Sequence, residues 1–139
     1  MLNKLLRIIS LLLIIISLNS CNSDDSIVDN NFDGITGSGN IIENQYGFKD
    51  FSKVQLSHSF KSKIIKGNEF KIILRIDDNL NEYVQVSYSD QLLSIQLDPD
   101  YNYQNVHLEA EITMPDLEFI ELSGACSAEI TGFNFTHNF

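Results

Sequence analysis

Residues 106–114, VHLEAEITM, decide the expected fold, because apolar and polar side chains alternate through the whole stretch. This alternation places the apolar side chains on one face of a half-buried β-strand. The same period of two runs through 84–88 and 93–97. Further strands are expected at 54–57, 60–66, 71–76, 117–122 and 127–131. No long segment after Cys21 has the 3.6-residue period of an amphipathic helix, so the sequence predicts an all-β fold with short strands.

The composition is that of one small globular domain with an acidic surface. The chain has 139 residues, of which 43% are hydrophobic, and 19 acidic residues outnumber 9 basic ones for a formal charge of −10. The apolar fraction is too high for a disordered chain and permits a modest core. The acidic balance argues against nucleic acid as a partner, because a phosphate backbone repels it.

Residues 1–20 are expected to form a helical lipoprotein signal peptide. Lys4 and Arg7 precede the apolar run 8–16, and small and polar residues follow it, which is the order of regions in a secretory signal. A single transmembrane anchor is the alternative, although the run is shorter than the ~20 residues that cross a bilayer. The segment Leu18-Asn19-Ser20-Cys21 resembles the lipobox of bacterial lipoproteins.

The lipobox resemblance implies that the Cys21 thiol carries a diacylglycerol and that the chain is cut before this residue. Such a protein is anchored to a membrane without spanning it, because each buried methylene of its acyl chains contributes ~0.8 kcal/mol. The alternative for Cys21 is a disulfide with Cys126, since exported proteins meet an oxidising compartment. If Cys21 is lipidated, Cys126 is expected to be an unpaired, small and buried side chain.

Residues 21–38 are expected to be a flexible acidic tether. The polar and acidic segment 22–26 resembles the export signal that sends Bacteroidetes lipoproteins to the cell surface, whereas a solvated tether needs nothing more than this composition. Turn signals follow at Asp33-Gly34 and Gly37-Ser38-Gly39-Asn40. The folded domain is therefore predicted to occupy residues 39–139.

The C-terminal part has the spacing of a β-solenoid coil. Leu117, Ile120 and Leu122 are spaced as inward aliphatic residues, and Ser123-Gly124 provides a small corner. One coil cannot bury its own apolar face, so other coils should stack on it. The sequence stops soon afterwards, at Phe139, which leads us to expect an incomplete stack with an uncapped edge.

Several short sequence segments in a fixed order resemble the head GIN domain of putative auto-transporter adhesins, a Bacteroidetes family. Over about residues 38–135 these segments are Gly37–Asn40, Phe51–Val54, Ile64–Gly67, Asp77–Leu80, Leu93–Ile95, Met114–Leu117 and Leu122–Gly124. The resemblance implies a right-handed, mostly parallel β-helix preceded by an antiparallel-like strand region, and a role in adhesion. It also implies that this chain is truncated at its C-terminus relative to other members.

No motif predicts a cofactor or a metal site. The glycines at 34, 37 and 39 lack the spacing of a nucleotide-binding loop. The segment 98–102 together with Glu109 imitates part of a calcium loop, but Tyr103 stands where that loop needs glycine. The histidines are too scattered to form a zinc ligand set: His58, His107 and His137.

No catalytic residue is predicted either, although paired carboxylates could point to a polysaccharide-cleaving enzyme. The pairs are Asp77 with Asp78 and Glu109 with Glu111. A glycosidase needs two carboxyl groups that converge across a cleft at ~5–9.5 Å. The strand alternation instead puts Glu109 and Glu111 on the solvent face.

Two pairs of residues are the weak candidates for binding. Lys61 and Lys63 share one face of an expected strand, where they either meet an anionic partner or protect a sheet edge, as lysine commonly does. Tyr101 and Tyr103 flank Asn102 in an expected loop. Their rings could stack on sugars or pack onto a neighbouring strand.

These observations predict an outer-membrane lipoprotein, exposed at the cell surface, with a binding role of adhesin type, no catalysis and no cofactor. Its expected partners are the membrane, through the lipid anchor, and a surface glycan or another envelope protein. Two alternatives stay open. One is a carbohydrate-active enzyme on a β-helix scaffold, and the other is a structural lipoprotein on the periplasmic face.

Overall fold

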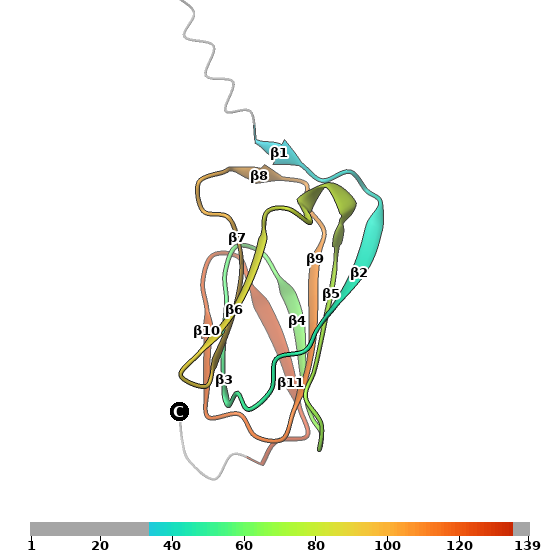
Figure 1. Ribbon diagram of the computed structural model, residues 1–139. Coiled ribbons are helices and arrows are strands. Elements are labelled where there is room, and N and C mark those ends of the chain that lie inside the picture. Colours follow the sequence, from blue (N-terminus) through green and yellow to red (C-terminus); the bar gives the residue numbers. More distant parts are fainter. Residues whose placement is uncertain (1–33, 135–139) are drawn as a thin grey trace, which may run out of the picture. The chain divides into compact units, whose positions relative to one another are not determined.

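The computed structural model describes residues 34–134, whose regular secondary structure is mostly β-strand (Figure 1). The strands are β1 (Ile35–Thr36), β2 (Ile41–Tyr46), β3 (Lys53–Leu56), β4 (Lys61–Lys66), β5 (Lys71–Asp77), β6 (Val84–Ser89), β7 (Leu92–Leu97), β8 (Tyr103–Gln104), β9 (Leu108–Met114), β10 (Phe119–Leu122) and β11 (Ser127–Thr131), and the 3-10 turn η2 (Asp78–Leu80) follows β5. The expected signal peptide and Cys21 lie outside the described residues. No helix within residues 34–134 is long and apolar enough to cross a membrane.

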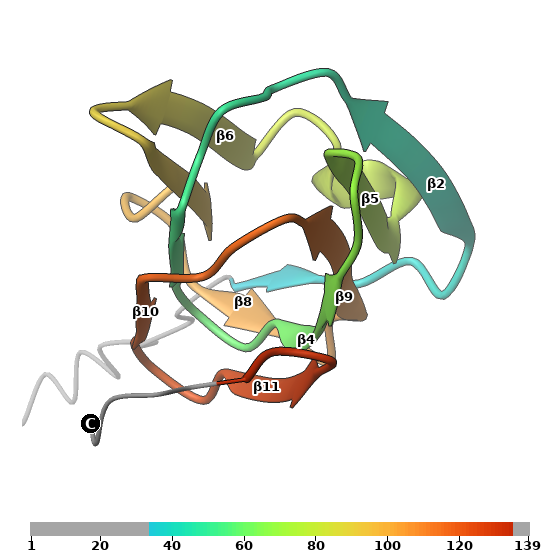
Figure 2. The same cartoon turned by 90° about the horizontal axis from the view of Figure 1, so that it is seen from below.

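The strands form three sheets. One has four strands in the order β10-β3-β7-β6, a second has five in the order β11-β4-β9-β5-β2, and the third is the short pair β1-β8. The two larger sheets lie on opposite sides of the domain, and the β1-β8 pair covers one end (Figures 1 and 2). The sequence predicted an all-β fold, and a mostly β structure is confirmed for residues 34–134.

Three strand pairs repeat one arrangement. Each of β3–β4, β7–β9 and β10–β11 contributes one strand to each larger sheet, and the pairs run parallel to one another. Phe119 aligns with Lys53 and Ser127 aligns with Lys61, so β10–β11 stacks on β3–β4 at one offset of 66 residues. The antiparallel strands β5 and β6 come between the first two pairs in sequence. An antiparallel strand, β2, precedes the first parallel pair as the resemblance implies, and β5 and β6 add antiparallel pairing within the parallel region.

The core lies between the two larger sheets and uses the residues that the period of two selects. Along β9 the side chains alternate between buried and half-buried, and β7 shows the same alternation. Ile95 and Leu97 on β7 and Ile112 on β9 are fully buried in one cluster. Burial of each such side chain contributes about 1.5–3 kcal/mol.

Each expected strand is present, with bounds shifted by at most two residues. Three strands were not expected, namely β1, β2 and β8. In β2 the adjacent Ile41 and Ile42 point to opposite faces, which blurs the alternation. β1 and β8 have two residues each, too few for any period to be visible.

The segment 35–39 belongs to the fold, whereas the sequence predicted a tether as far as residue 38. Ile35 packs against the core, and β1 pairs with β8. Asp77, which is buried, secures this entry: its Oδ1 accepts the Gly39 N–H at 2.7 Å and its Oδ2 accepts the His107 N–H at 2.6 Å. A buried carboxylate needs such donors, so Asp77 serves to join the chain entry to the connection before β9.

Candidate functional site

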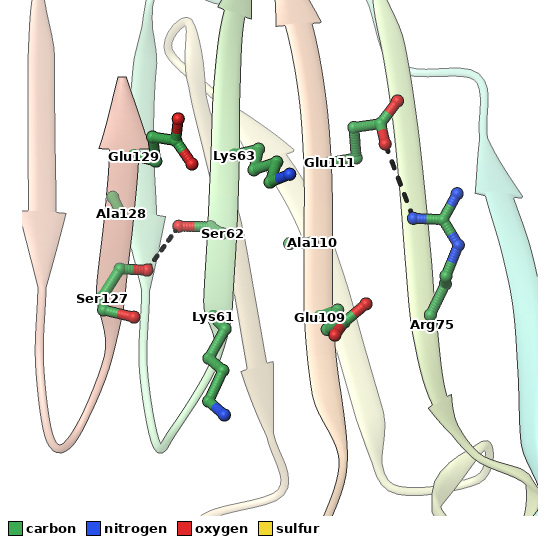
Figure 3. Close-up of a pocket in the computed structure, with 10 residues that line it drawn as sticks. All are labelled: Lys61, Ser62, Lys63, Arg75, Glu109, Ala110, Glu111, Ser127, Ala128 and Glu129. Carbon is green, nitrogen blue, oxygen red and sulfur yellow. Dashed lines mark hydrogen bonds and ion pairs between the residues drawn. The ribbon is translucent and has the colours of Figure 1, made fainter. Parts of the chain in front are cut away.

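The outer face of the five-stranded sheet carries a shallow hollow of about 470 Å³, shown in Figure 3 and called here the charged hollow. Strands β4, β5, β9 and β11 supply its lining. The lining residues are Lys61, Ser62, Lys63, Arg75, Glu109, Ala110, Glu111, Ser127, Ala128 and Glu129. As predicted, Glu109 and Glu111 lie on the solvent side of β9, where they are half-buried.

Charges of opposite sign alternate across the charged hollow. In the sheet register Lys61 is aligned with Glu109, and Glu109 with Arg75. The Arg75 guanidinium lies 3.1 Å from a Glu43 oxygen through Nε and 3.5 Å from a Glu111 oxygen through Nη1. Such half-exposed pairs stabilise a fold only weakly. Their main consequence is that neighbouring charges cancel, so the face presents no strong field of one sign.

Lys61 and Lys63 do not protect a sheet edge, and that prediction is wrong. β4 lies inside the five-stranded sheet, between β11 and β9. Both lysines line the charged hollow, and neither makes an ion pair with another residue of the described part. Their part in binding stays a prediction.

A second hollow of about 370 Å³, called here the tyrosine pocket, lies beside β8. It is lined by His58, Ser59, Leu97, Tyr101, Asn102, Tyr103 and Val106. These residues come from the β3–β4 connection, the end of β7 and the segment that leads through β8 to β9. The structure thus brings the two predicted tyrosines together and adds His58 and Ser59, which no sequence motif linked to them.

The rings around the tyrosine pocket are held edge-to-face. Tyr101 is 49% exposed, and its ring centroid lies 5.0 Å from that of Tyr83. Tyr103 stands nearly perpendicular to the His58 ring at 5.7 Å. It lies in β8 rather than in a loop, and its hydroxyl donates to the Asp98 carbonyl at 2.9 Å. Edge-to-face contacts fix ring orientations and are worth about 0.5–1.5 kcal/mol each.

Two groups in the lining of the tyrosine pocket, His58 and Tyr103, are uncharged at neutral pH. Burial lowers the pKa of His58 below its usual value, and the Ser57 carbonyl opposes this only in part. His58 Nδ1 accepts the Leu97 N–H at 3.3 Å, so the neutral ring carries its proton on Nε2. Burial, followed by the negative charge of Asp98, raises the pKa of Tyr103 to about 12.

The described residues do not assemble a metal site or a reactive thiol. Residues 34–134 contain no group of three or more His, Cys, Asp or Glu side chains that could hold a metal ion. In the calcium-like segment, Asp98 Oδ1 accepts the Asp100 N–H at 3.0 Å and so closes a turn. Cys126 is a free, half-buried thiol whose pKa is raised by burial, which keeps it in the unreactive protonated form.

The sequence model of the family described as "Putative auto-transporter adhesin, head GIN domain" matches residues 50–137. The chain belongs to this family. The match includes the strand pairs β3–β4, β7–β9 and β10–β11 and the whole lining of both hollows. The head GIN resemblance in the sequence is therefore confirmed. A search of curated proteins found no match.

Solved structures of Bacteroidetes proteins share the fold of this head GIN domain. A "putative adhesin" from Bacteroides fragilis is 23% identical with a TM-score of 0.65, over 70% of this chain and 46% of the other. One from Parabacteroides merdae is 16% identical with a TM-score of 0.61, over 69% and 41%. A "Putative lipid binding protein" from Parabacteroides distasonis is 16% identical with a TM-score of 0.64, over 70% and 43%. The chain thus spans less than half the length of these proteins.

Proposed function

We propose that this head GIN domain protein is an exported, non-catalytic binding protein of adhesin type, held in the outer membrane by a lipid on Cys21. The observation that carries the proposal is the family match over residues 50–137. The order of basic, apolar and small residues in 1–20 supports export. The acidic segment 22–26 favours the outer face of the membrane over the periplasmic face.

Three of the carboxylates that the sequence offered as possible catalytic groups favour a binding role over a catalytic one. Asp77 accepts backbone N–H groups through both oxygens, and Asp78 accepts the Ser38 hydroxyl at 2.5 Å. Glu111 pairs with Arg75. A glycosidase needs two carboxyl groups free to act on one bond. These acids already have structural partners, so a carbohydrate-active enzyme is not favoured.

The three parallel strand pairs are proposed to be coils of a β-solenoid. For β3–β4 and β10–β11 the shared offset of 66 residues supports this, since it holds for β10 on β3 and for β11 on β4. For β7–β9 the support is that β7 pairs in parallel with β3 and β9 in parallel with β4. Two sheets that keep the same offset belong to one repeating unit wound between them. The outer face of the five-stranded sheet, with its alternating charges, is suited to contact with a partner surface.

Lipid labelling and protease access test the proposal. The full chain is expressed in a Bacteroidetes host with radioactive palmitate, and intact cells are treated with protease. We expect a labelled protein that protease removes from intact cells. Cys21→Ala should abolish the label, whereas the matched change Cys126→Ala should leave it in place.

The periplasmic alternative and the absence of a lipid anchor each have their own result in this experiment. A labelled protein that resists protease in intact cells but not in broken cells would place it on the periplasmic face and overturn the surface role. An unlabelled wild-type protein, or a label that survives Cys21→Ala, would overturn the lipid anchor.

A further inference from the structure

The tyrosine pocket differs from the charged hollow in having no charged group in its lining. Its seven lining residues include no acid, lysine or arginine, and the lowered pKa of His58 leaves that ring neutral. Asp98 and Asp100 lie beside it, and the Asp98 charge acts on the Tyr103 hydroxyl. A negatively charged ligand would be repelled at this place.

Two of the residues that line the same pocket have polar side chains without a hydrogen-bond partner in the described part of the chain. They are Ser59 and Asn102, and neither the Ser59 hydroxyl nor the Asn102 side-chain amide hydrogen-bonds to another residue between 34 and 134. Together they offer donors and acceptors without charge. A few polar groups among aromatic and aliphatic side chains are the usual composition of a small-ligand site.

The pocket is held in shape before any ligand arrives. The Asn102 carbonyl accepts the Ile35 N–H at 2.7 Å, which ties the segment to β1. The His58 carbonyl accepts the Ala125 N–H at 2.6 Å, which ties the other wall to the β10–β11 connection. Tyr101 is oriented by the Tyr83 ring while half of its surface stays open. A ligand would therefore cost little conformational entropy of the protein.

We propose that the tyrosine pocket binds an uncharged saccharide unit, with the exposed Tyr101 ring as the stacking surface and Ser59 and Asn102 as hydrogen-bond partners. A pyranose ring has an apolar C–H face that fits an aromatic ring, and a rim of neutral hydroxyls that fits amide and hydroxyl groups. This inference rests on the proposed binding function and names its class of ligand. The charged hollow is not needed for it.

Calorimetric titration of the full chain tests this assignment. The lipidated protein is purified in a zwitterionic detergent that has no sugar head group. It is titrated with cellotetraose, maltotetraose and mannotetraose, and with the anionic tetragalacturonate. We expect at least one neutral tetrasaccharide to bind and tetragalacturonate to bind more weakly than that sugar. Tyr101→Ala should weaken binding about tenfold, the loss that one aromatic contact of about 1.4 kcal/mol produces.

Tyr88→Ala is the matched control, because Tyr88 is also an exposed tyrosine but lies on β6 outside the pocket. It should leave the affinity within about twofold, since distant surface changes have small effects. The assignment is overturned if no neutral tetrasaccharide binds, if tetragalacturonate binds best, or if both variants lose affinity equally. Palmitate labelling and protease access do not depend on Tyr101, so a failure here is distinguishable from a failure of the proposed function.

Discussion

The stacked strand pairs β3–β4 and β10–β11 place similar residues at aligned positions and bury them to very different extents. Leu56 on β3 is aligned with Leu122 on β10, yet Leu56 is 0% exposed and Leu122 is 41% exposed. Among the described residues β3 has a paired strand on both sides, whereas β10 has one. Because both residues are leucine, the difference in burial at these aligned positions follows the number of neighbouring strands.

The corners that follow β3 and β10 also differ, in the residue that each can accept. His58 and Gly124 both have a positive φ, 76° and 72°. His58 lines the tyrosine pocket. At Gly124 a Cβ would collide with the His58 carbonyl. The β10–β11 corner thus needs glycine because it packs against the β3–β4 corner. The β3–β4 corner can carry a side chain, and His58 there lines the tyrosine pocket.

Truncation of the two aligned leucines should show the largest difference. Leu56→Ala should lower the free energy of unfolding by about 3 kcal/mol, because it leaves a cavity in a packed core. Leu122→Ala should cost about 1 kcal/mol, since its side chain is already half in water. Urea denaturation of each variant measures this. Equal losses would contradict the idea that the outer pair is less buried.

Alanine substitution of two glycines with positive φ tests how much the packing of the β10–β11 corner on the β3–β4 corner contributes to stability. Gly124→Ala should cost about 2 kcal/mol, because strained backbone adds to the collision with the His58 carbonyl. Gly39→Ala is the control: φ is 81°, but a Cβ there would meet nothing within 4 Å. It should cost about 1 kcal/mol, the backbone part alone. If both changes cost the same in urea denaturation, the packing of the two corners contributes nothing.

The smallest expected effect is a pH dependence of stability, which comes from His58 in the β3–β4 corner. Because the folded state lowers the pKa of His58, the unfolded chain binds more protons just below the usual histidine pKa of about 6.5. Stability is then lost as pH falls from about 6.5 through the folded pKa, and it returns as pH rises.

His58→Asn should reduce this loss, since asparagine tolerates a positive φ and does not titrate. Urea midpoints of wild type and variant between about pH 7 and pH 5 measure the difference. Two curves that stay parallel would show that His58 does not contribute to the pH dependence.

Local pattern predicted much of the fold and less of the candidate sites. Alternation placed β7 and β9 to within two residues, because a side-chain period of two is a local property of the chain. The prediction that Lys61 and Lys63 protect a sheet edge was wrong, because β4 pairs with a strand on each side and the sequence does not show which strands these are. Tyr83 was not linked to Tyr101 and Tyr103, because contacts across separate connections leave no spacing in the sequence.

The sequence by itself determined the β class, the family and the residues that face the core, because each of these depends on side chains within a few positions of one another or on their order along the chain. Only the tertiary structure decided that β10–β11 stacks on β3–β4, and that His58, Ser59 and the tyrosines enclose one pocket. Both outcomes depend on hydrogen bonds between backbone segments far apart in the chain, and such pairing is a property of the whole fold.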